Sequence, residues 1–230
     1  MGLHCKTSEV NPGNIYLGGW QSRPYNSNMK QIVSLKRSLA FFSRTLCAVF
    51  PGSATIQLMR LLNGIHLNSV ELEPVIKSIK RRTPCNLLVF GLGNDSQFWA
   101  SLNRRGRTIF LEDNEYWYKV ILQRDPFIRA YLVNYQTRRS QWQELLDTPD
   151  LLIMSLPEEI QMTSWDIILV DGPNGFNDDN PGRMKSIYLA SKLASKTGGK
   201  YSCTIVIVRL NRLTVTNISS PRISFLKLES

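Results

Sequence analysis

The residue types with most chemical potential lie in three short segments, each of which follows a run of apolar residues. The first follows the apolar run at 86–90 and contains Gly91, Gly93, Asn94, Asp95 and Ser96. Two glycines permit a tight turn and a close approach of the backbone to a ligand, and the N–H groups of a following helix can bind that ligand. The segment lacks the third glycine of the G-x-G-x-x-G fingerprint, because Ser96 stands there, so a plain strand-to-helix turn is the alternative.

The second segment follows the apolar run at 107–111 and contains Glu112, Asp113 and Asn114. It lies about twenty residues beyond the glycine loop, the spacing at which nucleotide-binding α/β domains place an acid on the ribose hydroxyls. A carboxylate accepts hydrogen bonds from both hydroxyls more strongly than a neutral side chain does. We therefore expect Glu112 to bind the ribose with Asp113 beside it, whereas Asp113 or Asn114 could instead cap the next helix.

The third segment follows the apolar run at 167–170 and begins with Asp171, after which Gly172 and Pro173 turn the chain away. Packing does not readily explain an acid at the end of a buried strand, although an ordinary loop acid is the alternative. The three segments together fit either a nicotinamide-dependent enzyme or a methyltransferase. An incomplete glycine fingerprint together with an acid after this strand favours methyl transfer.

These segments can meet only if the strands that precede them lie side by side in one sheet. Short apolar runs alternate with amphipathic segments from residue 86 onward, the pattern of a parallel sheet covered by helices. Such a sheet binds ligands outside the carboxyl ends of its strands, so the three segments should share one rim. The predicted strands are 86–90, 107–111, 130–134, 165–170 and 203–208, and the predicted helices between them are 95–103, 115–123 and 182–196.

The rest of the chain surrounds this predicted domain. Apolar spacings predict three further helices at 32–50, 54–67 and 71–82. We divide the chain into a poorly ordered leader (1–30), an N-terminal helical extension (31–84), an α/β domain (85–210) and a C-terminal tail of atypical sequence (211–230). No apolar stretch reaches the length of about 20 residues that a membrane-spanning helix needs. No targeting signal is recognised.

The composition is that of a folded protein, with 43% hydrophobic and 20% charged residues, but the net charge is +10. Residues 1–84 carry +8 and residues 198–230 carry +4, whereas residues 85–197 carry −2. Because the basic excess lies outside the predicted site, a nucleic-acid methyltransferase is the last-ranked alternative, and nucleic acid is not expected as a partner. Four cysteines without a C-x-x-C pair and only two histidines predict no metal site.

The motifs resemble the plant polysaccharide-biosynthesis family that contains the glucuronoxylan 4-O-methyltransferases and the irregular-xylem proteins. The resemblance covers about half of the chain. It rests on four stretches in order: PCNLLVFGLGNDS at 84–96, GRTIFLEDN at 106–114, WDIILVDGPNG at 165–175 and PGRM at 181–184.

The resemblance implies a Rossmann-like domain that uses S-adenosylmethionine, with the 4-hydroxyl of glucuronic acid side chains on xylan as the acceptor, in the Golgi. Asp171 would then be the base that removes the hydroxyl proton, or a carboxylate that orients the hydroxyl. An acidic polysaccharide also needs a cation, for which Arg183, and after it Arg138 or Arg139, could pair with the uronate carboxylate. The alternative for Arg183 is a brace for the loop that contains Asp171.

The sequence departs from the family after residue 198. Members usually carry a His-Asp pair after the fifth strand, whereas Val206, Ile207 and Val208 are followed here by Arg209. A catalytically silent relative with a structural or polymer-binding role in xylan synthesis is therefore the second hypothesis.

Overall fold

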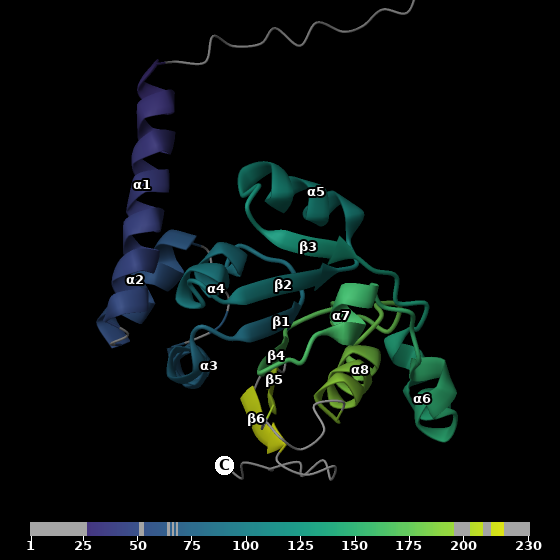
Figure 1. The fold of residues 1–230 in the computed structure, drawn as a ribbon. Coiled ribbons are helices and arrows are strands. Elements are labelled where there is room, and N and C mark those ends of the chain that lie inside the picture. The colour runs from purple at the N-terminus through teal and green to yellow at the C-terminus, as the bar shows by residue number, and fades with distance from the viewer. Residues whose placement is uncertain are drawn as a thin grey trace, which may run out of the picture.

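The computed structural model describes residues 27–50, 53–63, 65, 67, 69–195, 203–208 and 213–218. Its centre is a six-stranded sheet in the order β3-β2-β1-β4-β5-β6, in which β1 to β5 run parallel and β6 runs antiparallel to β5 (Figure 1). The strands are β1 (Asn86–Phe90), β2 (Arg107–Glu112), β3 (Arg129–Leu132), β4 (Ile167–Val170), β5 (Cys203–Val208) and β6 (Leu213–Ile218). The expected Rossmann-like α/β class is confirmed.

The order of the strands fixes where a ligand can bind. The chain places β2 and β3 on one side of β1, and β4, β5 and β6 on the other. The space outside the carboxyl ends of β1 and β4 is thus the topological switch point, where open α/β sheets bind their ligands. All three segments singled out in the sequence leave strands that border or adjoin this point.

Side chains alternate between the two faces of the sheet, and each face is covered by helices. Leu87 and Val89 of β1 face a core formed with α2 (Ser53–Asn63), α3 (Ser69–Arg82), α4 (Ser96–Leu102) and α5 (Glu115–Arg124). Leu88 and Phe90 face the opposite core, formed with α7 (Glu158–Met162) and α8 (Met184–Ser195). Because both faces are buried, β1 and β4 consist of continuous apolar residues, as parallel strands do.

The N-terminal helices are integrated with the sheet. Helix α1 (Ser27–Val49) packs on α2 and α4, and α2 and α3 contribute Met59 and Ile76 to the core beneath β1. The Arg82 guanidinium donates to the carbonyl of Asp166, 2.6 Å away, just before β4. Residues 1–26, which include most of the predicted leader, lie outside the described residues.

The predicted strands 86–90 and 203–208 match β1 and β5, and the others differ by one or two residues at their ends. Two expectations were incomplete. Residues 139–162 form the short helices η1 (Arg139–Gln141), α6 (Trp142–Asp147), η2 (Pro149–Leu152) and α7, which were not predicted. The sequence also placed residues 211–230 in a tail, whereas 213–218 form β6, in which apolar and polar residues alternate as an edge strand allows.

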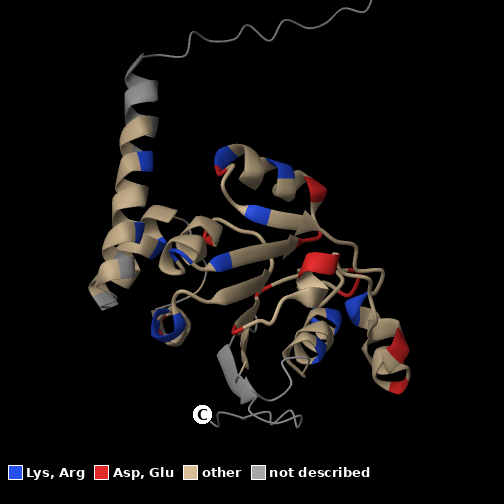
Figure 2. Ribbon diagram, viewed as in Figure 1, with Lys and Arg blue, Asp and Glu red and all other residues tan. Residues whose placement is uncertain are grey.

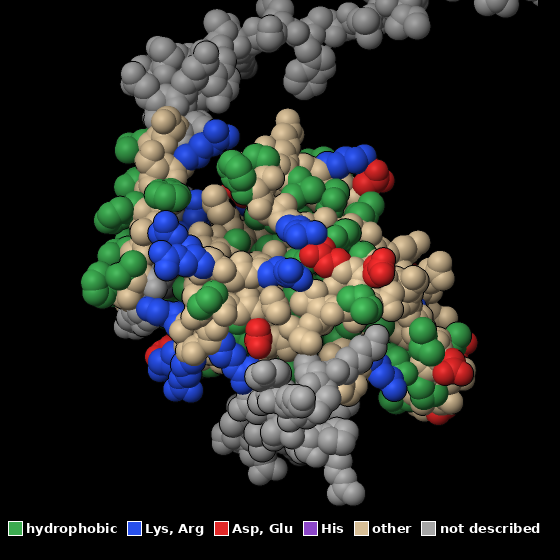
Figure 3. Space-filling model, in the orientation of Figure 1, with side chains coloured by type: hydrophobic (Ala, Val, Ile, Leu, Met, Phe, Trp, Pro, Cys, Tyr) green, Lys and Arg blue, Asp and Glu red, His purple; other side chains and the backbone are tan. Residues whose placement is uncertain are grey.

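Charged side chains are spread over many elements. Lys and Arg gather on α3 and near the starts of β2 and β3, among other places, and acidic residues lie on α6 and α7 as well as at the ends of central strands (Figure 2). Figure 3 shows apolar side chains at the surface along α1, and Leu35 and Phe42 are among the exposed residues of this helix. Within the described ranges, no helix combines the length and the apolarity needed to cross a membrane.

Candidate active site

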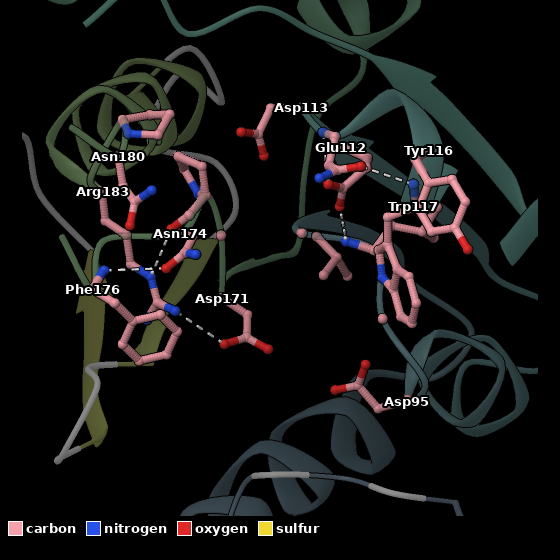
Figure 4. Close-up of a pocket in the computed structure, with 18 of the residues that line it drawn as sticks. Asp95, Glu112, Asp113, Tyr116, Trp117, Asp171, Asn174, Phe176, Asn180 and Arg183 are labelled. Atoms are coloured by element: carbon pink, nitrogen blue, oxygen red, sulfur yellow. Dashed lines mark hydrogen bonds and ion pairs between the residues drawn. The ribbon is translucent and has the colours of Figure 1, made fainter. Parts of the chain in front are cut away.

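A pocket of about 480 Å³ lies at the switch point. Its size is within the range of about 300–1,000 Å³ that is typical of small-molecule and cofactor sites. Figure 4 shows two walls, with residues from β2 and α5 on one side and residues from the segment between β4 and α8 on the other. Of the eleven predicted site residues, seven line the pocket: Gly91, Gly93, Asp95, Glu112, Asp113, Asp171 and Arg183.

The floor of the pocket is backbone. Gly91 has a φ of +111°, a conformation that L side chains rarely adopt. A Cβ built on Gly172 would lie 2.9 Å from the Gly91 Cα, so neither glycine leaves room for a side chain. The N–H groups of Asp171 and Gly172 both donate to the carbonyl of Phe90, at 2.9 and 2.6 Å. The ends of β1 and β4 are therefore joined directly beneath the pocket.

Glu112 ends β2 and ties two segments of the pocket together. Its side chain is buried, and its two carboxylate oxygens accept from the N–H groups of Leu92 and Asn114, at 2.8 and 2.9 Å. Burial raises the pKa of Glu112, and these two hydrogen bonds partly offset the rise. Each carboxylate oxygen can accept more than one hydrogen bond, so the side chain keeps capacity for a ligand hydroxyl.

The rest of this wall comes from the start of α5. The Asn114 side chain accepts from the N–H of Trp117 and caps α5. The predicted alternative role of Asn114 as a helix cap is therefore confirmed. Asp113 is partly exposed and points into the pocket (Figure 4), and burial raises its pKa. Tyr116 and Trp117 also line the pocket and were missed in the sequence. Two aromatic residues in the first turn of a helix after an acidic strand end were the available signal.

Asp95 lies at the bottom of the pocket as drawn in Figure 4. Its carboxylate accepts a hydrogen bond of 2.9 Å from the indole N–H of Trp99. Burial raises the pKa of Asp95, against the lowering effect of that indole. A second partly buried carboxylate therefore faces the same cavity as Glu112.

Asp171 and Arg183 form the opposite wall. Their side chains lie 3.5 Å apart, and Arg183 also donates to the carbonyl of Pro173. Burial lowers the pKa of Arg183 and the Asp171 carboxylate raises it. The Arg183 Nη1 is buried without a hydrogen-bond partner among the described atoms. These contacts fit the alternative role for Arg183, a brace for the loop that contains Asp171, better than a role in binding the uronate carboxylate of a substrate. The uronate role stays a prediction.

Four predicted site residues do not line the pocket. Ser96 is buried and its hydroxyl accepts from the N–H of Gly93, and Asn94 turns away to accept from Arg124, at 2.8 Å in each case. Arg139 donates from Nη1 to the carbonyls of Gly175 and Phe176, and Arg138 pairs with Asp179. The two arginines therefore contact the loop between β4 and α8 instead of lining the pocket.

Among the described residues, no group of three or more His, Cys, Asp or Glu side chains is placed to hold a metal ion. The pocket offers four carboxylates, glycine backbone and aromatic side chains around an open centre. Such a set can bind hydroxyl and amino groups of a nucleoside-type ligand on one wall. It leaves Asp171 to contact a second, reacting molecule from the other wall.

Comparisons with known proteins identify relatives of this chain. A family model described as IRX15/IRX15L/GXM matches residues 70–151 and 147–223. Among curated proteins of Arabidopsis thaliana, the chain is 42% identical over 138 residues to glucuronoxylan 4-O-methyltransferase 1, covering 52% of this chain and 49% of that protein. It is 36% identical over 162 residues to arabinogalactan O-methyltransferase 2, covering 62% and 56%. It is 37% identical over 158 residues to protein IRX15-LIKE, covering 60% and 50%.

The chain spans about half the length of the curated relatives that it matches. No solved structure matches it. The family match extends to residue 223, which corrects the view that the sequence leaves the family after residue 198. The missing His-Asp pair is a difference at a few positions after β5, whereas the apolar residues of β5 and β6 keep the pattern of sheet strands.

Proposed function

The chain belongs to the IRX15/IRX15L/GXM family, and from this premise we propose that it is an S-adenosylmethionine-dependent O-methyltransferase of the 4-hydroxyl of glucuronic acid side chains on xylan. The observation that carries the proposal is the pocket at the switch point, where Glu112 and Asp171 face one another from different walls. A donor bound on the first wall would leave an acceptor free to approach from the second.

The residues of the first wall fit the donor. The glycine backbone at Gly91 allows close approach, and Glu112 with Asp113 would accept hydrogen bonds from the ribose hydroxyls. Asp95 would supply a carboxylate for the amino group, and Trp117 an apolar face for the purine. When bound, the donor supplies an electrophilic methyl group on a sulfonium sulfur.

Asp171 would act on the acceptor. A sugar hydroxyl is a weak nucleophile near neutral pH, so a carboxylate within hydrogen-bond reach would orient it and take its proton as the new C–O bond forms. Arg183, paired with Asp171 at 3.5 Å, would hold that carboxylate in place. This assigns Arg183 a positioning role on Asp171 before any contact with substrate.

The acceptor and the location are inferred from relatives. The relative named for glucuronoxylan is 42% identical, and the one named for arabinogalactan is 36% identical. We therefore place glucuronoxylan first among acidic polysaccharides. Synthesis of such polymers for the cell wall belongs to the secretory pathway, and within it we propose the Golgi apparatus.

The test uses the full chain, purified. Titration calorimetry with S-adenosylmethionine measures donor binding, and labelled donor with glucuronoxylan or arabinogalactan measures transfer. The proposal expects donor binding and methylation of glucuronic acid O4 in glucuronoxylan, identified by NMR of released oligosaccharides. Donor binding without transfer to either polymer would favour the second hypothesis, in which the protein is a catalytically silent relative. Absence of both binding and transfer would contradict the proposal.

A further inference from the structure

The loop between β4 and α8 exposes an aromatic side chain at the mouth of the pocket. Phe176 is 68% exposed and lines the pocket, and Figure 4 shows its ring beside Asp171 on the second wall. It is the one large apolar side chain that is exposed among residues 171–183, all of which are described. Single exposed apolar side chains are common on protein surfaces, so what sets Phe176 apart is its position in the lining of the pocket beside Asp171.

The backbone that presents this ring is fixed on both sides. The N–H of Phe176 donates to the Asn174 side chain at 3.1 Å, and its carbonyl accepts from Arg139 Nη1 at 3.0 Å. The loop is closed by the N–H of Gly182, which donates to the carbonyl of Asn174 at 3.0 Å. The ring therefore projects from a defined position.

Neighbouring segments hold the loop as a unit. Arg139 Nη1 also donates to the carbonyl of Gly175, and its Nε pairs with Asp178 at 3.7 Å. The N–H groups of Arg139 and Ser140 donate to the carbonyls of Asn180 and Asp178, at 2.7 and 3.1 Å. Arg138 and Arg139 thus hold the loop through these contacts, and neither lines the pocket.

We propose that Phe176 is the aromatic platform on which a pyranose ring of the acceptor stacks, next to the hydroxyl that Asp171 contacts. This inference rests on the proposed function, because it assigns the acceptor to the second wall. The C–H groups on one face of a pyranose ring form an apolar surface, and an aromatic ring covers that surface without competing for the hydroxyls. Arg139 is then a positioning residue, which acts on the acceptor only through Phe176.

The test separates acceptor binding from donor binding. Calorimetry of the full chain with S-adenosylmethionine alone gives donor affinity. The second titration uses xylo-oligosaccharides that carry one glucuronic acid branch, in the presence of S-adenosylhomocysteine, and gives acceptor affinity without turnover. Phe176→Ala should weaken acceptor affinity by about threefold to tenfold, the range for one aromatic contact, with donor affinity unchanged. Phe176→Trp should retain acceptor affinity.

Phe127→Ala is the matched control, because Phe127 is 101% exposed, does not line the pocket and precedes β3. It should leave both affinities unchanged. Arg139→Lys should also weaken acceptor affinity, and adding it to Phe176→Ala should cause little further loss, since both changes act through one ring.

Unchanged acceptor affinity in Phe176→Ala would overturn the inference, as would an equal loss of donor affinity in that variant or an equal loss in Phe127→Ala. These results leave the proposed function standing, because the wild-type protein still binds and methylates the acceptor. Failure of the wild-type protein to bind the branched oligosaccharides overturns the proposed acceptor and the platform together.

Discussion

The two walls of the pocket are built in different ways. On the first wall, Glu112 is buried at a strand end and its carboxylate is held by two backbone N–H groups. On the second wall, Phe176 is exposed on a loop whose backbone is held by side chains such as Arg139, which donates to the Phe176 carbonyl. The first wall is fixed by the sheet itself, whereas the second can change its surface chemistry without disturbing the core. Under the proposed function, this difference suits one methyl donor for the whole family and an acceptor that differs among relatives, as the names of two of them do.

The largest effect is expected on the second wall, at Asp171. Asp171→Asn keeps the size of the side chain but removes the carboxylate proposed to accept the proton, so the turnover number should fall by about 10²–10⁴-fold while donor affinity stays the same. Labelled-methyl transfer and calorimetry measure the two quantities. Asp179→Asn, at an exposed position on the same loop that does not line the pocket, should leave both unchanged. Loss of donor affinity in Asp171→Asn would remove the distinction between the walls.

On the first wall, Glu112→Gln should lower donor affinity by about 10–100-fold, as expected for loss of charge-assisted hydrogen bonds. The same change disturbs the contacts to Leu92 and Asn114, so a second ligand separates the two causes. The wild-type protein should bind 2′,3′-dideoxy-S-adenosylhomocysteine more weakly than S-adenosylhomocysteine. If Glu112 binds the ribose, the difference in affinity between the two ligands should be smaller in the variant than in the wild-type protein, and the remainder should come from Asp113 and the amide oxygen of the new side chain. An undiminished preference for the ribose hydroxyls in the variant would contradict this role.

A smaller effect is expected where the walls meet. Gly172→Ala places a Cβ 2.9 Å from the Gly91 Cα, and backbone cannot move aside as a flexible side chain can. The variant should lose about 1–3 kcal/mol in the free energy of unfolding, measured by urea denaturation. Gly175→Ala is the control, since its Cβ would lie 3.4 Å from its nearest neighbour, the Gly182 Cα, which is an ordinary van der Waals contact. Equal stability of the two variants would show that the walls are not tightly joined.

The smallest effect concerns pH. Burial raises the pKa of Glu112 above its ordinary 4.5, so the folded protein binds this proton more tightly than the unfolded chain does. Above pH 4.5 the contribution of Glu112 to the free energy of unfolding therefore falls as pH rises, until the raised pKa is passed. Donor affinity should rise over the same window, because ribose hydroxyls donate to the ionised carboxylate.

Thermal unfolding and donor titrations over this pH window check both trends. In Glu112→Gln both slopes should be reduced, and the slopes that remain should come from Asp95 and Asp113, whose pKa values burial also raises. Identical slopes in the variant and the wild-type protein would show that Glu112 does not titrate in this range.

The sequence predicted the sheet well because continuous apolar runs such as Ile167 to Val170 have few alternatives to a buried parallel strand. The positions of Gly91, Glu112 and Asp171 followed from those strand ends. The short helices at 139–162 were missed because each is only a few residues long and shows no sustained helical period. Strand β6 was missed because its pairing with β5 is not visible in local sequence.

Sequence could not show which side of a loop faces the pocket. Asn94 and Asp95 are neighbours in the glycine loop, yet only Asp95 faces the cavity, while Asn94 contacts Arg124 of α5. Likewise, Arg139 was expected at the substrate because its charge suits a uronate. Its contacts with Gly175 and Phe176 depend on how the loop after β4 folds back, which no local pattern predicts.

The burial of Met59 and Ile76 against the underside of β1 limits how far the chain can be shortened. A protein that began at residue 85 would still contain every residue assigned to the pocket, but it would expose the apolar face that α2 and α3 cover. Such an exposed face favours association between molecules over folding of one. The smallest soluble unit suitable for crystallisation should therefore start no later than α2.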